Sequence, residues 1–456
     1  MTESEFRELL TRGLDGIARW EASFRPFEPH RSLEVAPDVA GKAIDDLVVR
    51  LHDNYPFFHP DYAGQMLRPP HAVALAAYAT AARINPNNHA LDGGPATAQM
   101  ERECLDQIAA MFGFTAPYLG HLTTSGTIAN LEALWVARSL HPDKAIAFSS
   151  EAHYTHARMC ELLGLKTVVL PADARGAMEY SALAALGESD AVGTVVVTAG
   201  TTAAGAVDPI DAVVELARTR GWRVHVDAAY GGFFATLARH PDAQLDASLW
   251  TAISRADSVV VDPHKHALQP YGCGAVLFAD PKVGAFYKHD SPYTYFTSRE
   301  LHLGEISLEC SRPGAAAAAL WATLQCFPLN AGGLGISLLA SRRAALIAYD
   351  AARSSGSLVP IMQPELDIFT VAPMAPEQRV TVSRVSQRSE EIFERCQNDR
   401  ERPLFLAKWR LPQAVGRQAL PLLEWDEPHC TVLRSVMMKP EHESEARTIV
   451  ARISSY

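Results

Sequence analysis

Two short valine-rich runs constrain the fold of this chain more than any other feature. Residues 257–263 read Asp-Ser-Val-Val-Val-Asp-Pro and lead directly to Lys265. Residues 223–228 read Arg-Val-His-Val-Asp-Ala and contain Asp227. Runs of this composition, followed by turn or breaker residues, are typical of buried strands in an α/β sheet. Because ligands of such sheets bind at the carboxyl ends of strands, we expect Asp227 and Lys265 to share one site.

The chemistry of this pair is specific. A lysine amine condenses with an aldehyde, and a carboxylate holds a protonated ring nitrogen. These are the two functions that a protein supplies to pyridoxal 5'-phosphate (PLP). Each residue alone also has a structural interpretation, because an aspartate at a strand end is often a cap and a lysine is usually solvated. The prediction therefore depends on their neighbours.

A candidate phosphate site precedes both residues. Residues 121–131, His-Leu-Thr-Thr-Ser-Gly-Thr-Ile-Ala-Asn-Leu, form a polar turn that opens an apolar helix ending near Leu140. Free N–H groups at a helix start bind phosphate, and the hydroxyls of Ser125 and Thr127 would add donors. Alone, Ser-Gly-Thr before a helix usually indicates only an N-cap. The elements also follow the order found in one large PLP-binding domain. That order is a phosphate cradle, a histidine segment, the aspartate and then the lysine.

Longer motifs extend this pattern. Ser-Gly-Thr-Ile-Ala-Asn-Leu-Glu-Ala-Leu, Ala-Gly-Thr-Thr-Ala-Ala-Gly-Ala-Val-Asp-Pro, His-Val-Asp-Ala-Ala-Tyr-Gly-Gly and Asp-Pro-His-Lys resemble the group II PLP-dependent amino-acid decarboxylases of fold type I. The resemblance runs over about residues 55–440. It looks closest to bacterial tyrosine decarboxylases, through Asn-Pro-Asn-Asn at 85–88, Pro-Tyr at 270–271 and a late Leu-Arg-Ser-Val-Met run. It implies an α/β fold with a seven-stranded, mainly parallel sheet in the large domain.

The resemblance also implies a role for each candidate site residue. Lys265 becomes the lysine that links covalently to the cofactor aldehyde, and Asp227 the partner of the pyridinium nitrogen. His153 corresponds to the histidine that stacks on the cofactor ring, and His156, one helical turn away, is its alternative. The expected catalytic residues are Lys265, Asp227, His153 and Tyr271.

Further residues are expected to hold the cofactor. Ala229 would pack under the ring, Thr202 would contact the ring or the substrate carboxylate, and His264 would help to hold the phosphate. The full set of expected cofactor-binding residues is Ser125, Gly126, Thr127, His153, Thr202, Asp227, Ala229, His264 and Lys265.

The reaction type follows from the family resemblance. PLP supports several reactions, and the Cα bond held perpendicular to the ring is the one that breaks. A decarboxylase also needs a proton donor to the resulting carbanion. Tyr271, six positions after Lys265, matches a tyrosine with that role in tyrosine decarboxylases. Tyr293 and Tyr295, in the polar loop 289–298, are the alternative, since many group II enzymes use a tyrosine on a mobile lid.

The substrate is expected to be an L-amino acid, by resemblance an aromatic one. An aromatic side chain needs an apolar pocket, for which the candidates are Tyr55, Phe57, Phe58 and Tyr62. Glutamate or aspartate would instead need a buried cation, for which Arg68 and Arg83 are candidates. An aminotransferase or a carbon-carbon lyase reaction is the remaining alternative.

Composition favours a large globular enzyme. The chain is 48% hydrophobic and 20% charged, and it has neither a long apolar run nor a signal peptide. Its seven cysteines form no Cys-x-x-Cys pair, which indicates reduced thiols and no structural metal. We therefore expect a cytoplasmic protein. The net charge of −11 disfavours nucleic acid and anionic membranes as partners, which leaves the small-molecule substrate.

Three units are expected along the chain. Residues 1–54 read as an N-terminal helical arm, 55–330 as the large PLP-binding domain and 331–456 as a small C-terminal α+β domain. In the last unit, 366–372 and 404–409 read as strands. The resemblance implies that subunits exchange the arm, so a homodimer is expected.

Overall fold

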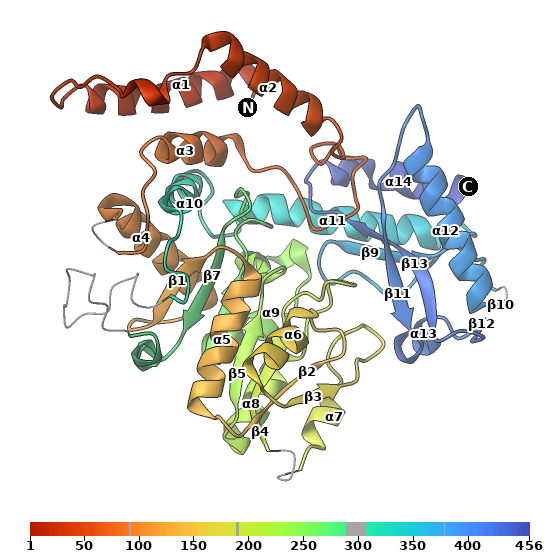
Figure 1. Ribbon diagram of the computed structural model, residues 1–456. Coiled ribbons are helices and arrows are strands. Elements are labelled where there is room, and N and C mark those ends of the chain that lie inside the picture. Colours follow the sequence, from red (N-terminus) through yellow and green to blue (C-terminus); the bar gives the residue numbers. More distant parts are fainter. Residues whose placement is uncertain (91–92, 188–190, 289–306, 378) are drawn as a thin grey trace.

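The computed structural model describes residues 1–90, 93–187, 191–288, 307–377 and 379–456 (Figure 1). Its central element is a seven-stranded sheet with the order β1-β7-β6-β5-β4-β2-β3. The strands are β1 (Leu119–Thr123), β2 (Ala145–Ser149), β3 (Thr167–Leu170), β4 (Val192–Thr198), β5 (Arg223–Asp227), β6 (Ser258–Val261) and β7 (Gly274–Phe278). Within this sheet β7 alone runs antiparallel to its neighbours. The predicted mainly parallel, seven-stranded sheet is therefore confirmed.

The two valine-rich runs form the adjacent strands β5 and β6, in which Asp227 pairs with Val260. Every residue of β4 and β6 is buried, which explains why these strands lack a polar alternation. The helices of this part are α3 (Ala72–Ala82), α4 (Pro95–Phe112), α5 (Gly126–Leu140), α6 (Thr155–Leu163), α7 (Tyr180–Ala184), α8 (Ile210–Arg220), α9 (Ala247–Ala252) and α10 (Gly314–Cys326). Short 3-10 turns are η3 (Gly232–Leu237), η4 (Pro241–Ala243), η5 (Ile253–Arg255) and η6 (Pro281–Phe286). Helix α5 ends at Leu140, as predicted.

The C-terminal part lies beside the large sheet and is coloured cyan to blue in Figure 1. It contains α11 (Leu334–Arg353), α12 (Val382–Asn398), α13 (Gln413–Ala419) and α14 (His442–Ser455). Its strands are β8 (Val359–Pro360), β9 (Ile368–Ala372), β10 (Val380–Thr381), β11 (Ala407–Pro412), β12 (Leu423–Glu424) and β13 (His429–Val436). They form a four-stranded sheet of order β11-β13-β9-β8 and a two-stranded pair of β10 and β12.

One predicted strand of this part is displaced. The expected strand at 404–409 begins only at Ala407, because the preceding residues are bonded elsewhere. Leu404 N–H donates to the carbonyl of Cys396, and Phe405 N–H donates to that of Asp61. The apolar run 404–406 therefore connects the C-terminal part to the start of the large domain before the strand begins.

The N-terminal segment lies along one edge of the molecule (Figure 1). It folds as α1 (Glu3–Glu21), a 3-10 turn η1 (Arg31–Leu33) and α2 (Pro37–Leu51). Neither α1 nor α2 contains a buried residue in the single chain. Among the described residues, no helix combines the length and apolarity that crossing a membrane requires.

Candidate active site

All of the predicted catalytic and cofactor-binding residues line one cavity of about 450 Å³, called the Lys265 cavity below. They are Ser125, Gly126, Thr127, His153, Thr202, Asp227, Ala229, His264, Lys265 and Tyr271. They follow the carboxyl ends of the parallel strands β1, β2, β4, β5 and β6, because parallel strands bring these ends to one edge of a sheet. Residues spread over much of the sequence thus meet at a single place.

Asp227 is the buried acid of the cavity, with 4% of its surface exposed. Its Oδ2 atom accepts a hydrogen bond of 2.8 Å from His156 Nε2, and its Oδ1 atom accepts one of 3.1 Å from the Ala229 N–H. Burial works to raise the pKa of this carboxyl, but the hydrogen bond from His156 and the nearby charge of Lys265 hold the pKa well below its usual range. Asp227 is therefore a carboxylate that faces the cavity.

Lys265 has a partner that the sequence analysis did not assign. Its Nζ atom lies 3.1 Å from Oδ2 of Asp262, whose side chain is 4% exposed against 20% for the lysine. The Asp-Pro-His-Lys motif already indicated this contact. Asp262 lies three residues before Lys265, and such a spacing brings two side chains together when the backbone turns. The second oxygen of Asp262, Oδ1, is buried and has no hydrogen-bond partner among the described residues.

The start of α5 lines the Lys265 cavity at the place where the sequence predicts a phosphate cradle. Ser125 is its N-cap, and the Ser125 hydroxyl accepts a 3.3 Å hydrogen bond from the Ile128 N–H. Gly126 lies against Asp262, so that a Cβ atom at Gly126 would stand 2.6 Å from Oδ2 of that residue. Only glycine lets the helix start approach the end of β6 this closely. Thr127 completes the cradle at the exposed side.

The structure separates the two candidate histidines. His153 lines the Lys265 cavity, and its Nδ1 atom lies 2.6 Å from the Thr155 hydroxyl. Burial lowers the pKa of His153, so the ring is held towards its neutral form. His156 does not line the cavity and instead contacts Asp227 from a fully buried position.

His264 and Tyr271 lie side by side at the cavity. The Nδ1 atom of His264 donates a 2.8 Å hydrogen bond to the Cys273 carbonyl, and its ring centroid is 4.6 Å from that of Tyr271. Tyr271 is 60% exposed, so its hydroxyl is accessible to a ligand. The alternative donors, Tyr293 and Tyr295, lie outside the described residues.

Other cavity residues were not predicted to contribute. Asn130, Thr198 and Tyr230 line the cavity as well. Tyr230 Oη donates a 2.5 Å hydrogen bond to Asp367 Oδ1. The Asp367 Oδ2 atom in turn lies 2.9 Å from Nε2 of His266, the residue after the lysine. These hydrogen bonds of Asp367 connect the cavity wall to the C-terminal part of the chain.

The candidate substrate residues lie elsewhere in the single chain. Tyr62 packs against Phe57 and Tyr55, at centroid distances of 4.9 and 6.2 Å, and neither these residues nor Phe58 line the Lys265 cavity. Arg83 forms a 2.6 Å ion pair with Glu21. Arg68 donates to the Met438 carbonyl at 3.2 Å. The predicted aromatic slot and substrate cation are thus not part of the described cavity. The aromatic rings pack on one another, Arg83 pairs with α1, and Arg68 contacts the C-terminal part of the chain.

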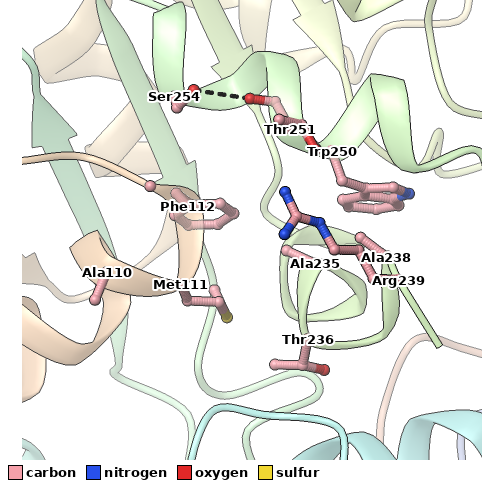
Figure 2. Close-up of a pocket in the computed structure, with 11 residues that line it drawn as sticks. Ala110, Met111, Phe112, Ala235, Thr236, Ala238, Arg239, Trp250, Thr251 and Ser254 are labelled. Carbon is pink, nitrogen blue, oxygen red and sulfur yellow. Dashed lines mark hydrogen bonds between the residues drawn. The ribbon is translucent and has the colours of Figure 1, made fainter.

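Two other cavities differ in their chemistry. One, of about 520 Å³, adjoins the Lys265 cavity, because both are lined by His153, Tyr154 and Thr202. Another, of about 400 Å³, lies between the end of α4 and η3, where Figure 2 shows Arg239 near Trp250. The hydroxyls of Thr236 and Ser254 donate to backbone carbonyls three residues earlier, at 2.7 and 2.8 Å. This remote cavity therefore offers no acid-base pair.

Comparison with known sequences agrees with this geometry. The model of a family described as pyridoxal-dependent decarboxylase conserved domain matches residues 52–330. An L-tyrosine decarboxylase of Enterococcus faecium is 27% identical over 448 residues, which cover 75% of this chain and 73% of that protein. A probable L-tyrosine/L-aspartate decarboxylase of Methanoculleus marisnigri is 31% identical over 262 residues, or 57% of this chain and 68% of that protein.

Solved structures share the fold. The structure of Oryza sativa TDC with PLP and tryptamine has a TM-score of 0.79 at 18% identity, and the match covers 100% of this chain and 98% of that one. That of mouse CSAD has a TM-score of 0.77 at 21% identity, covering 99% of this chain and 91% of that one. At these identities the likeness concerns the fold.

The cavity fits the cofactor of that family. A buried carboxylate at Asp227 suits a protonated ring nitrogen, and the amine of Lys265 reaches the same space. The start of α5 is shaped by Gly126, where a larger residue would collide with Asp262. A volume of about 450 Å³ is within the range of small-ligand pockets. The chain belongs to the pyridoxal-dependent decarboxylase family and is an amino-acid decarboxylase that uses PLP.

Proposed function

We propose that the enzyme decarboxylates an aromatic L-amino acid to its amine, with Lys265, Asp227, His153 and Tyr271 as its catalytic residues. The observation that carries this proposal is that the residues expected from the sequence line a single cavity. Bound PLP supplies the electron sink for the charge left at Cα when carbon dioxide departs. The chain's own residues hold and orient the reactants.

Each binding role has a physical basis. Lys265 would hold the cofactor aldehyde through its Nζ atom, and Asp227 would keep the ring nitrogen protonated. The N–H groups at the start of α5, with the hydroxyls of Ser125 and Thr127, hold the phosphate. His264 assists them. His153 stacks on the ring, a contact that contributes about 0.5–1.5 kcal/mol beyond burial.

Two smaller contacts complete the proposed cofactor site. Ala229 packs under the ring, and its N–H group fixes the Asp227 carboxylate through the 3.1 Å hydrogen bond. Thr202 contacts the ring or the substrate carboxylate from the cavity wall. Gly126 lets the helix start come close enough to the phosphate.

Tyr271 is the proposed proton donor. A phenol hydroxyl within hydrogen-bond reach protonates Cα and so completes the amine. The exposed position of Tyr271, beside His264 at the cavity, supports this role. Tyr293 and Tyr295 remain the alternative donors.

The aromatic substrate is supported by the relatives, which include the L-tyrosine decarboxylases of Enterococcus faecium and Levilactobacillus brevis. It is also supported by the adjoining cavity, whose lining includes Tyr154, Phe393 and Trp409. A large planar side chain would gain contact area there at little entropic cost to the protein.

An acidic substrate is the second candidate, and one residue favours it. Arg434 lines the adjoining cavity, is 5% exposed, and donates to the carbonyls of Thr202, Ala203 and Gly64. Within the described part of the chain it has no carboxylate partner at ion-pair distance. A buried guanidinium of this kind suits a carboxylate side chain.

A substrate panel separates the two candidates. The purified holoenzyme is incubated with each standard L-amino acid, and amine and carbon dioxide are quantified together. We expect tyrosine or another aromatic amino acid to give stoichiometric amine and carbon dioxide. Turnover of aspartate or glutamate alone would support the second candidate, and amine transfer without carbon dioxide would contradict both.

We further propose a homodimer with residues 1–54 as an exchanged arm, 55–330 as the large domain and 331–456 as the small one. Helices α1 and α2 expose apolar side chains, including Trp20, Ile44, Leu47 and Val48, which a monomer rarely leaves uncovered. Sedimentation of an active monomer would contradict the dimer. A cytoplasmic location is proposed from the seven free cysteines.

A further inference from the structure

His156 is a buried histidine with no assigned role. It does not line the Lys265 cavity, and its side chain has 0% exposure. Its Nε2 atom nevertheless lies 2.8 Å from Asp227 Oδ2. Among the described residues it is the only side chain that donates a hydrogen bond to this carboxylate, since the other bond comes from the backbone N–H of Ala229.

The hydrogen-bond inventory defines the protonation of His156. Its Nδ1 atom is buried and has no partner within the described part of the chain. A proton on Nδ1 would be a buried, unpaired donor, which is costly. A carboxylate can only accept. The Nε2 atom therefore carries a proton, which is directed at Asp227.

A second histidine close by is occupied elsewhere. The Nε2 atom of His225 lies 2.8 Å from Oδ1 of Asn130, an oxygen that only accepts, so this nitrogen carries the proton. Its Nδ1 atom lies 2.8 Å from the hydroxyl of Ser258, which donates to it. Burial lowers the pKa of His225 to about 3, so His225 is neutral and has no proton left for Asp227.

We propose that His156 is a positioning residue, whose Nε2–H fixes Asp227 as an oriented carboxylate ready to receive the protonated ring nitrogen of PLP. The inference rests on the proposed role of Asp227. It adds that the protein orients the Asp227 carboxylate before the cofactor binds. A charge-assisted hydrogen bond in a buried site is strong enough to hold the carboxylate in one orientation.

The test compares two ligands in two proteins. Dissociation constants of the cofactor-stripped full chain are measured for PLP and for a PLP analogue in which C–H replaces the ring nitrogen. This is done for the wild type and for His156→Leu, which removes the donor but keeps an apolar side chain. The analogue has no ring nitrogen for Asp227 to hold. A change in its affinity therefore measures every effect of the substitution except the one that acts through Asp227.

We expect the wild type to bind PLP more tightly than it binds the analogue. We expect His156→Leu to weaken PLP binding about 10- to 100-fold and to change analogue binding less than about threefold, so the preference for PLP is lost. His156→Gln, which retains a side-chain N–H donor, should restore most of it. His442→Leu is the control for loss of a buried histidine, because His442 bonds the Pro60 carbonyl and does not line the cavity.

The outcomes distinguish the two proposals. A wild type that binds both ligands equally overturns the role of Asp227 itself. A wild type that prefers PLP, with an equal preference in His156→Leu, overturns the role of His156 alone. Should His156→Leu fail to fold, histidine-selective ¹⁵N spectra of the cofactor-stripped wild type at pH 8 decide the matter. A ring that carries a proton on Nε2 supports the inference, whereas an Nδ1–H tautomer with a bare Nε2 contradicts it.

Discussion

The amine of Lys265 lies 3.1 Å from the carboxyl of Asp262, three residues earlier in the chain. The same carboxyl is in contact with Gly126 at the start of α5. Asp262 therefore joins the lysine proposed to link to the cofactor and the cradle proposed for its phosphate. Any change that moves this carboxyl should alter both parts of the cofactor site.

Gly126→Ala tests that connection. On helix propensity alone, alanine should stabilise α5 by up to about 1 kcal/mol. We expect the reverse, because the added Cβ would lie 2.6 Å from Asp262 Oδ2, and PLP binding should weaken at least about tenfold. Gly332→Ala is the control, since its nearest contact is 3.6 Å. Unchanged PLP affinity in Gly126→Ala, measured by absorbance titration, would contradict the close approach.

Asp227→Asn tests the buried acid. The substitution keeps the shape of the side chain but removes the charge that is proposed to hold a protonated ring nitrogen. We expect weaker PLP binding and a loss of several orders of magnitude in kcat, measured by carbon dioxide release. Near wild-type turnover would mean that the ring nitrogen is held in another way.

Tyr271→Phe removes only a hydroxyl. If Tyr271 is the donor, PLP and substrate still bind, and amine formation slows on the order of 10²–10⁴-fold. An aldehyde side product should rise at the same time, and both products can be measured by mass spectrometry. Wild-type behaviour here, together with a slow Tyr293→Phe or Tyr295→Phe, would assign the role to loop 289–298 instead.

Acid stability should depend on His442. Burial and the charge of Lys439 lower the pKa of His442 to about 4, from 6.5. Between these values the unfolded chain holds a proton that the folded chain lacks, so the free energy of unfolding falls as the pH falls, by about 1.4 kcal/mol per pH unit. Above pH 6.5 this contribution to stability is complete. Urea unfolding at pH 5 and 7 should show a smaller pH effect in His442→Gln, and an unchanged effect would contradict this origin.

The parts of the site that are local in sequence could be predicted. The valine runs identified β5 and β6, and the polar turn identified the start of α5, because burial and capping act over a few residues. Contacts that join distant segments could not. Tyr230 and Asp367 are 137 positions apart, and no local pattern indicates that pair. The sequence also left His153 and His156 as alternatives, because only the turn into α6 directs one to the cavity and the other to Asp227.

The start of β11 shows the same limit. The apolar run at 404–406 has the composition of a strand, but its backbone bonds to Asp61 and Cys396. A partner far away in sequence thus decided which residues entered the sheet, and propensity was overridden by tertiary contacts.

The central claim is that Lys265 holds the cofactor in this cavity. The purified holoenzyme is reduced with borohydride and digested, and the modified peptide is located by mass spectrometry. We predict one phosphopyridoxyl group, on Lys265, and none in Lys265→Ala. A label on another lysine of the wild type, or a label retained in Lys265→Ala, would contradict the account.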